Sequence, residues 1–206
     1  MEDLTIIKSL IRCTEVQAKI LHILALNTTE EKERQEINKN SLCDETDCDG
    51  ATIEKNIFAL PHVKMDGLIY PLISSLAESN DKYIWKWNEN VMTYIAVISS
   101  VPYLLFTAKS SYTVDFYELL SEYISGIKNP LTSATLDIEL VDLKRRMGCE
   151  NKYSNFSQFK TKVLEKAIPE LSNILHVNID YSFIKNGKEI IKIRFFIGGS
   201  APIQIR

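Results

Sequence analysis

The stretch YSNFSQFKTKVLEKAIPELSNIL, residues 153–175, decides the fold that we expect. Its apolar residues recur at helical spacing, and lysines stand between them. Asn155, with Gln158 three residues later, is typical of a capped helix start. We therefore predict an amphipathic helix with a basic exposed face. The apolar side is formed by Phe156, Phe159, Val163, Leu164, Ala167, Ile168 and Leu171, and the lysines are Lys160, Lys162 and Lys166.

A β-hairpin should follow this helix. The segments HVNIDYSFI (176–184) and EIIKIRFFI (189–197) alternate apolar and polar residues, as half-buried strands do. The dipeptide Asn186-Gly187 between them favours a type I′ turn.

Two further helices are expected before residue 153. YTVDFYELLSEYIS (112–125) follows a cap at Ser110 or Ser111, and ELVDLKRRM (139–147) is stopped by Gly148. A short extended piece, ATLDI (134–138), lies between them. Helix, strand, helix, helix and hairpin is the order of a winged helix.

The N-terminal half is less regular. TEVQAKILHILALNT (14–28) predicts a helix capped by Thr14, 29–52 an acidic loop, 68–78 a helix, and YIWKWNENV (83–91) a strand and turn. The run 91–108 has no charge, but it contains Thr, Ser and Pro and is barely long enough to cross a bilayer. We predict that it is buried core and that the protein has no membrane partner.

Composition and charge restrict the class of protein. The chain has 45% hydrophobic and 25% charged residues, an ordinary globular balance, and its four cysteines form no disulfide framework. No targeting segment is recognisable, so a cytoplasmic location is expected. Residues 1–143 carry a net charge of −10, whereas residues 144–206 carry +7. A basic third on an acidic body indicates a polyanionic partner, although a solvated basic surface is the alternative.

In helix-turn-helix proteins the third helix enters the major groove and the hairpin reaches the backbone or minor groove. We therefore expect the DNA-binding residues on these elements and on the helix before them. They are Lys144, Arg145, Arg146, Lys152, Asn155, Ser157, Gln158, Lys160, Thr161, Lys162, Lys166, Lys185, Asn186, Lys188, Lys192 and Arg194.

A helical projection divides the third helix into two faces. Gln158, Thr161, Lys162, Glu165 and Lys166 fall opposite the apolar arc. Gln158 can pair with adenine, Lys162 with guanine or phosphate, and Thr161 with a thymine methyl group or phosphate.

Four other residues of the third helix and the hairpin need separate treatment. Lys160 projects into the apolar arc, so it either extends along apolar surface to a phosphate or has no ligand. Pro169 should bend the helix, which limits the groove-facing part to 155–168. Lys192 and Arg194 contact DNA or are only the solvated face of a strand.

The sequence does not predict a cofactor, a metal site or an enzyme. DETDCDG lacks the glutamate that would end a calcium loop, and the cysteines and histidines are not spaced for zinc. No phosphate-binding glycine loop or nucleophile motif occurs.

The same residues resemble a known family. From Ser111 to Ile197, SYTVDFYELLSEY, LVDLKRRMGCENKYSNFSQFKTKVLEKAIPEL and VNIDYSFIKNGKEIIKIRFFI together resemble the C-terminal winged helix of plasmid replication initiator (Rep) proteins, which bind origin repeats called iterons. The resemblance implies an α+β chain of two winged helices in tandem, with domains at 1–105 and 106–206. It implies double-stranded DNA as the ligand, a homodimer, and host replication proteins as partners. The N-terminal domain would serve in dimerisation or DNA contact, although a helix-turn-helix is hard to place there.

Two other functions stay open at this point. One is a winged-helix transcriptional regulator that does not initiate replication. The other is a protein-interaction module that uses the basic hairpin to contact an acidic partner.

Overall fold

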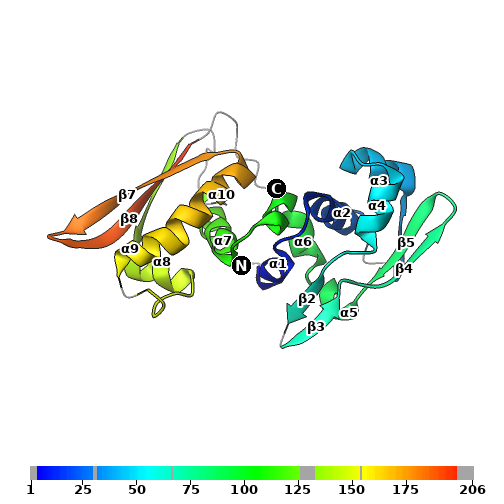
Figure 1. The fold of residues 1–206 in the computed structure, drawn as a ribbon, viewed down its shortest axis with the longest axis horizontal. Coiled ribbons are helices and arrows are strands. Elements are labelled where there is room, and N and C mark those ends of the chain that lie inside the picture. Colours follow the sequence, from blue (N-terminus) through cyan, green and yellow to red (C-terminus); the bar gives the residue numbers. More distant parts are fainter. Residues whose placement is uncertain (1–3, 30–31, 66, 126–132, 154, 199–206) are drawn as a thin grey trace. The chain divides into compact units, whose positions relative to one another are not determined.

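The computed structural model describes residues 4–29, 32–65, 67–125, 133–153 and 155–198. The chain divides between Lys109 and Ser110 into two compact units, each of which combines helices with antiparallel sheet (Figure 1). Each unit has the element order of a winged helix. The fold class is therefore α+β with two winged helices in tandem, as the sequence predicted.

In the N-terminal unit, α2 leads through β1 to the helix pair α3 and α4, and β4 and β5 return as a hairpin. β5 lies between β1 and β4 in a three-stranded sheet, and β2 pairs with β3 in a separate hairpin. The elements are α1 (Thr5–Leu10), α2 (Glu15–Leu26), β1 (Gln35–Asn38), α3 (Lys39–Thr46), α4 (Gly50–Ile57), β2 (His62–Met65), β3 (Leu68–Pro71), β4 (Ile73–Ser79), β5 (Lys82–Trp87), α5 (Glu89–Met92), α6 (Ile95–Ser100) and the 3-10 helix η1 (Tyr103–Thr107).

The prediction of an acidic loop over residues 29–52 is wrong, because β1 and the helix-turn-helix α3–α4 lie there. Two of the acidic residues, Asp47 and Asp49, lie at cap positions of these helices. Asp47 adopts the left-handed conformation at the end of α3, with φ of 56°. The Asp49 carboxylate accepts a hydrogen bond from the Thr52 N–H at 2.7 Å, and this bond lowers the pKa of Asp49. Each helix has only eight residues and buries two side chains, so neither gives a strong periodicity.

The predicted helix over residues 68–78 is also wrong, because this segment forms β3 and most of β4. Gly67, with φ of +80°, makes the turn into β3, and Pro71 stands at the end of that strand, where its missing N–H is tolerated. β4 is an edge strand with mostly exposed side chains. Its apolar residues therefore do not mark a buried face.

The predicted helix within 14–28, the strand within 83–91 and the burial of 91–108 are confirmed. Thr14 and Gln17 form a capping box at the start of α2, and Trp85 and Trp87 of β5 are buried. The run 91–108 contributes to the core, including the fully buried Leu105 and Phe106. Within the described ranges, no helix is long and apolar enough to cross a membrane.

In the C-terminal unit, three helical segments cover one face of the sheet β6-β8-β7 (Figure 1). Phe116 and Phe195 meet edge to face across this interface, with ring centroids 5.7 Å apart. The elements are α7 (Ser111–Ser125), β6 (Ala134–Glu139), α8 (Leu140–Arg146), α9 (Phe156–Phe159), the π-helical turn η2 (Lys160–Leu164), α10 (Glu165–Leu175), β7 (Asn178–Asn186) and β8 (Glu189–Gly198).

The third helix is the continuous run α9, η2 and α10. Asn155 caps its start, because the Asn155 side-chain oxygen accepts a hydrogen bond from the Gln158 N–H at 2.9 Å. The helix continues through Pro169 to Leu175 and ends at the left-handed His176. The proline therefore does not end the helix, and a π-turn that the sequence did not predict lies nine to five residues before it.

The hairpin turn differs from the prediction by one residue. Asn186 pairs with Glu189, so the two-residue loop is Gly187-Lys188. Only Gly187 has positive φ, at +60°, which is the pattern of a type II′ turn rather than type I′. A bulge between Ile184 and Lys185 in the pairing register absorbs one residue and moves the turn.

Candidate nucleic-acid interface

One face of the third helix is polar and exposed. Its buried side holds Phe159, Val163 and Leu164, all fully inaccessible to solvent, together with the next apolar turns of α10. This confirms the two faces of the helical projection. The exposed residues are Ser157, Gln158, Thr161, Lys162, Glu165 and Lys166.

The π-turn places the side chains of Lys160 and Glu165 close together. A π-turn contains more residues than an α-turn, so the helix beyond it is rotated relative to a regular α-helix. This rotation brings Glu165, which follows the turn, toward Lys160, and the half-exposed Lys160 ammonium pairs with Glu165 Oε1 at 3.2 Å. Lys160 is therefore neither buried nor unpaired, because its ammonium reaches the exposed Glu165.

The cations of α8 are all engaged within the unit. Lys144 donates to the Tyr153 carbonyl at 3.2 Å and lies 5.7 Å from the centre of the Phe159 ring, so it ties the loop before the third helix to the helix itself. Arg145 donates to Asp142 at 2.5 Å, and Arg146 to Glu122 at 2.7 Å.

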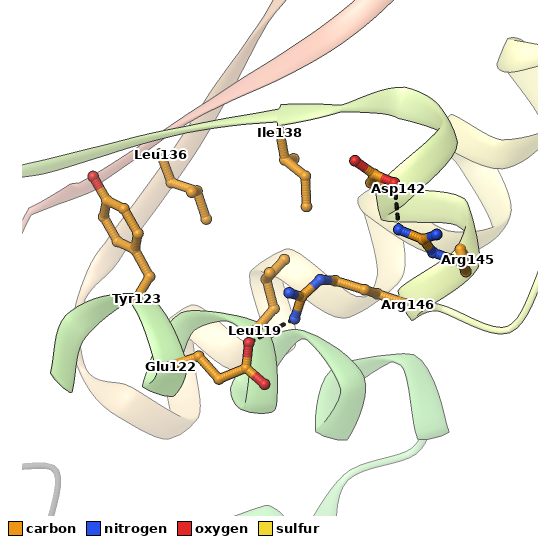
Figure 2. A pocket seen from close by; sticks show the side chains of 8 residues that line it. All are labelled: Leu119, Glu122, Tyr123, Leu136, Ile138, Asp142, Arg145 and Arg146. Carbon is orange, nitrogen blue, oxygen red and sulfur yellow. Dashed lines mark hydrogen bonds and ion pairs between the residues drawn. The ribbon is translucent and has the colours of Figure 1, made fainter. Parts of the chain in front are cut away.

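Both arginines line a concavity of about 370 Å³ between α7, β6 and α8. Figure 2 shows their guanidinium groups beside the carboxylates, with Leu119 next to Arg146 and the apolar side chains of Leu136 and Ile138 across the opening. The arginines are therefore matched in charge by Glu122 and Asp142 at this site.

The loop between α8 and the third helix is set by a glycine C-cap. Gly148 has φ of +55°, and the Cys149 N–H donates to the Lys144 carbonyl at 2.9 Å, which closes α8 as the sequence predicted. Lys152 follows in the same loop and is exposed.

The hairpin of β7 and β8 is the wing of this unit, and its exposed lysines without an ion pair to another described residue lie at the turn. Lys185, Asn186 and Lys188 are exposed around the turn. Phe183 of β7 meets Phe156 at the start of the third helix edge to face, with centroids 4.9 Å apart. This contact brings the wing strand against the beginning of the third helix.

Lys192 and Arg194 lie elsewhere. They alternate along β8 with the buried Ile193 and Phe195, so they point away from the helices. Lys192 pairs with Glu139 at 2.7 Å, which raises the pKa of Lys192. Arg194 donates two hydrogen bonds of 2.6 Å to Asp137, and these lower the pKa of that carboxyl group. Their placement favours the solvated strand face.

The structure thus divides the predicted cations into two groups. Lys144, Arg145, Arg146, Lys160, Lys192 and Arg194 have partners within the unit. A second group is exposed and has no ion pair with another described residue. It consists of Lys152, Lys162, Lys166, Lys185 and Lys188.

Sequence reasoning missed a second helix-turn-helix, α3–α4. Its second helix exposes Ala51, Glu54 and Lys55. The available signal was Asp49 three residues before Thr52, followed by Ile53 and Ile57 one turn apart.

Comparison with known proteins supports the resemblance. Residues 139–197 match the family model described as initiator Rep protein, WH2. The fold of the whole chain is similar to the Pi initiator protein, solved in complex with iteron DNA, with a TM-score of 0.53, 17% identity and 95% of each chain covered. Domains 2 and 3 of RctB match with a TM-score of 0.36 and 10% identity, over 90% of this chain and 82% of that one. The search of curated proteins finds no match. The predicted resemblance is therefore confirmed, and the initiator Rep match over residues 139–197 lies within the C-terminal winged helix.

Proposed function

We propose that the protein binds double-stranded DNA sequence-specifically at origin repeats and so initiates plasmid replication. The observation that carries the proposal is the exposed face of the third helix, where polar side chains and unpaired lysines adjoin a wing with a basic tip. The initiator Rep match over this segment and the iteron-bound Pi initiator with a similar fold support it.

The mechanism is binding and deformation of DNA without bond-making chemistry. Gln158, Thr161 and Lys162 reach base edges from the third helix, since amide, hydroxyl and ammonium groups match the donors and acceptors of the major groove. Lys152, Lys166, Lys185 and Lys188 neutralise phosphates around them. No cofactor enters this mechanism, and the cytoplasm is where it operates.

The N-terminal unit has its own helix-turn-helix, α3–α4. We place it in DNA contact or dimerisation, and host replication proteins are partners of the assembled initiator. The proposed function does not depend on which role the unit takes.

The test is binding of the whole chain to duplexes that contain the tandem repeats beside its gene. Tight binding to these duplexes, weak binding to scrambled ones of equal length, and loss of both at high salt are expected. Equal affinity for both duplexes would remove the sequence-specific claim. A replicon that lacks such repeats would favour the transcriptional regulator.

Initiation is tested separately by complementation. The chain, supplied in trans, should maintain a plasmid that carries the repeats but lacks the gene. Binding without maintenance would identify a regulator rather than an initiator.

A further inference from the structure

We propose that Glu165 is a specificity-determining residue that selects a cytosine in the major groove, and that Lys160 positions it. This inference rests on the proposed function and adds a base-reading role for an acidic residue. The DNA contacts of the proposed function involve only basic and polar residues, so they do not include this role.

Glu165 lies within the exposed face of the third helix. It follows Thr161 by four residues and precedes Lys166, and all three are exposed. Val163 and Ala167 on the opposite side are buried, so the helix cannot rotate Glu165 away from the surface without exposing them. A protein that places Lys162 in the groove therefore brings the Glu165 carboxylate to the same groove.

The π-turn links Lys160 to Glu165 in a way that a regular helix does not. Side chains five residues apart do not face each other in an α-helix. Here the Glu165 N–H donates to the Lys160 carbonyl across the π-turn, and the two side chains pair at 3.2 Å. The π-turn thus brings the Lys160 ammonium and the Glu165 carboxylate together.

Electrostatics determines from which base this carboxylate accepts a hydrogen bond. A bare carboxylate close to phosphates is repelled, so it needs a neighbouring cation and a donor to accept from. Guanine and thymine present only acceptors in the major groove, and adenine places its N7 acceptor beside its amino group. Cytosine offers an amino donor with no acceptor of its own, which makes it the base that a carboxylate prefers.

The experiment compares base preferences. The full-length protein and the variant Glu165→Gln each select sites from a randomised duplex library, and the enriched sequences are counted at every position. The control is Glu139→Gln. It removes the same charge from a Lys–Glu pair of similar exposure in the same unit, but on the outer face of the sheet.

We expect wild type and Glu139→Gln to enrich one cytosine that Glu165→Gln no longer requires, with discrimination there reduced ~10-fold. Lys160→Gln should weaken the same preference and leave the preferences at other positions in place. Glu165→Asp, which keeps the carboxylate, should retain part of it.

Two outcomes overturn the inference alone. In one, Glu165→Gln keeps every base preference; in the other, it raises affinity for all duplexes equally, which would make Glu165 only repulsive. A wild-type chain that enriches no sequence would overturn the proposed function and this inference together.

Discussion

At the scale of single residues, the number of basic side chains matters less than the contacts that each one already makes. Arg194 is held by two hydrogen bonds to Asp137, and Lys144 by a carbonyl and an aromatic ring. Lys162 is exposed and has no ion pair with any residue that the structure describes. A cation such as Lys162 can bind a phosphate or a base without first breaking a contact within the protein, whereas Arg194 and Lys144 cannot.

Lys162→Ala should weaken binding to the selected site by about 1 to 3 kcal/mol and relax the preference at one position, because Lys162 faces the groove. Fluorescence anisotropy titration at fixed salt measures the loss. Lys192→Ala is the matched control and should change affinity much less, because Lys192 is paired with Glu139 on the outer face of the sheet. Equal losses in the two variants would contradict the division of the cations into two groups.

The cysteines also differ by environment. Burial raises the pKa of Cys13 to about 11, and burial likewise raises the pKa of Cys149, whereas Cys43 and Cys48 are partly exposed. At pH 8 a thiol reagent should therefore label Cys43 and Cys48 quickly in the native protein and all four cysteines after unfolding. Mass spectrometry of the labelled peptides checks this, and rapid native labelling of Cys13 would show that its site opens.

At the scale of helices and strands, success of prediction followed the strength of the buried pattern. The third helix was predicted because its apolar residues recur over several turns, and the wing because both strands alternate. α3 and α4 were missed because two buried side chains in eight residues do not establish a period. The π-turn could not be predicted, since it is a backbone insertion that no residue type specifies.

Two details of the hairpin and sheet could not be predicted, because they depend on strand register and strand neighbours rather than on residue type. The turn moved by one residue because a bulge changed the register. The pairing of Lys192 and Arg194 depended on β6 lying beside β8, a neighbour far away in the sequence. Their side chains were identifiable in advance, but their partners were not.

Asn155 was predicted both to cap the third helix and to contact DNA, and the structure confirms the cap. Asn155→Ala should lower the free energy of unfolding by about 0.5 to 2 kcal/mol, whereas Asn155→Ser should restore most of it, because serine also caps helices. Urea unfolding followed by circular dichroism measures both. If Asn155→Ala leaves stability unchanged but weakens DNA binding, the residue is a contact and not a cap.

At the scale of the whole molecule, the acidic total does not oppose DNA binding. The net charge of −3 combines an acidic body with a basic C-terminal third, and within that third many cations are neutralised in pairs. Long-range attraction to DNA should therefore depend more on the five exposed lysines of the C-terminal unit that have no ion pair with another described residue than on overall charge.

The salt dependence of binding should reflect this number. In the proposed mechanism Lys162 reaches a base edge, so four of these five lysines, Lys152, Lys166, Lys185 and Lys188, neutralise phosphates and predict a log–log slope of about −4 for the C-terminal unit. Lys166→Gln with Lys188→Gln should make the slope shallower by about 2, and Glu139→Gln with Lys192→Gln should leave it unchanged. A wild-type slope steeper than this would assign further phosphate contacts to the N-terminal unit.

The ion pairs between β6 and β8 have a kinetic consequence. They leave the outer face of the sheet nearly neutral while the helix face and the wing tip stay positive. The C-terminal unit is thus an electric dipole, and the field of a duplex exerts a torque on it before any contact forms. Asp137 and Glu139, which touch no DNA in this arrangement, thereby raise the fraction of encounters in which the third helix arrives first.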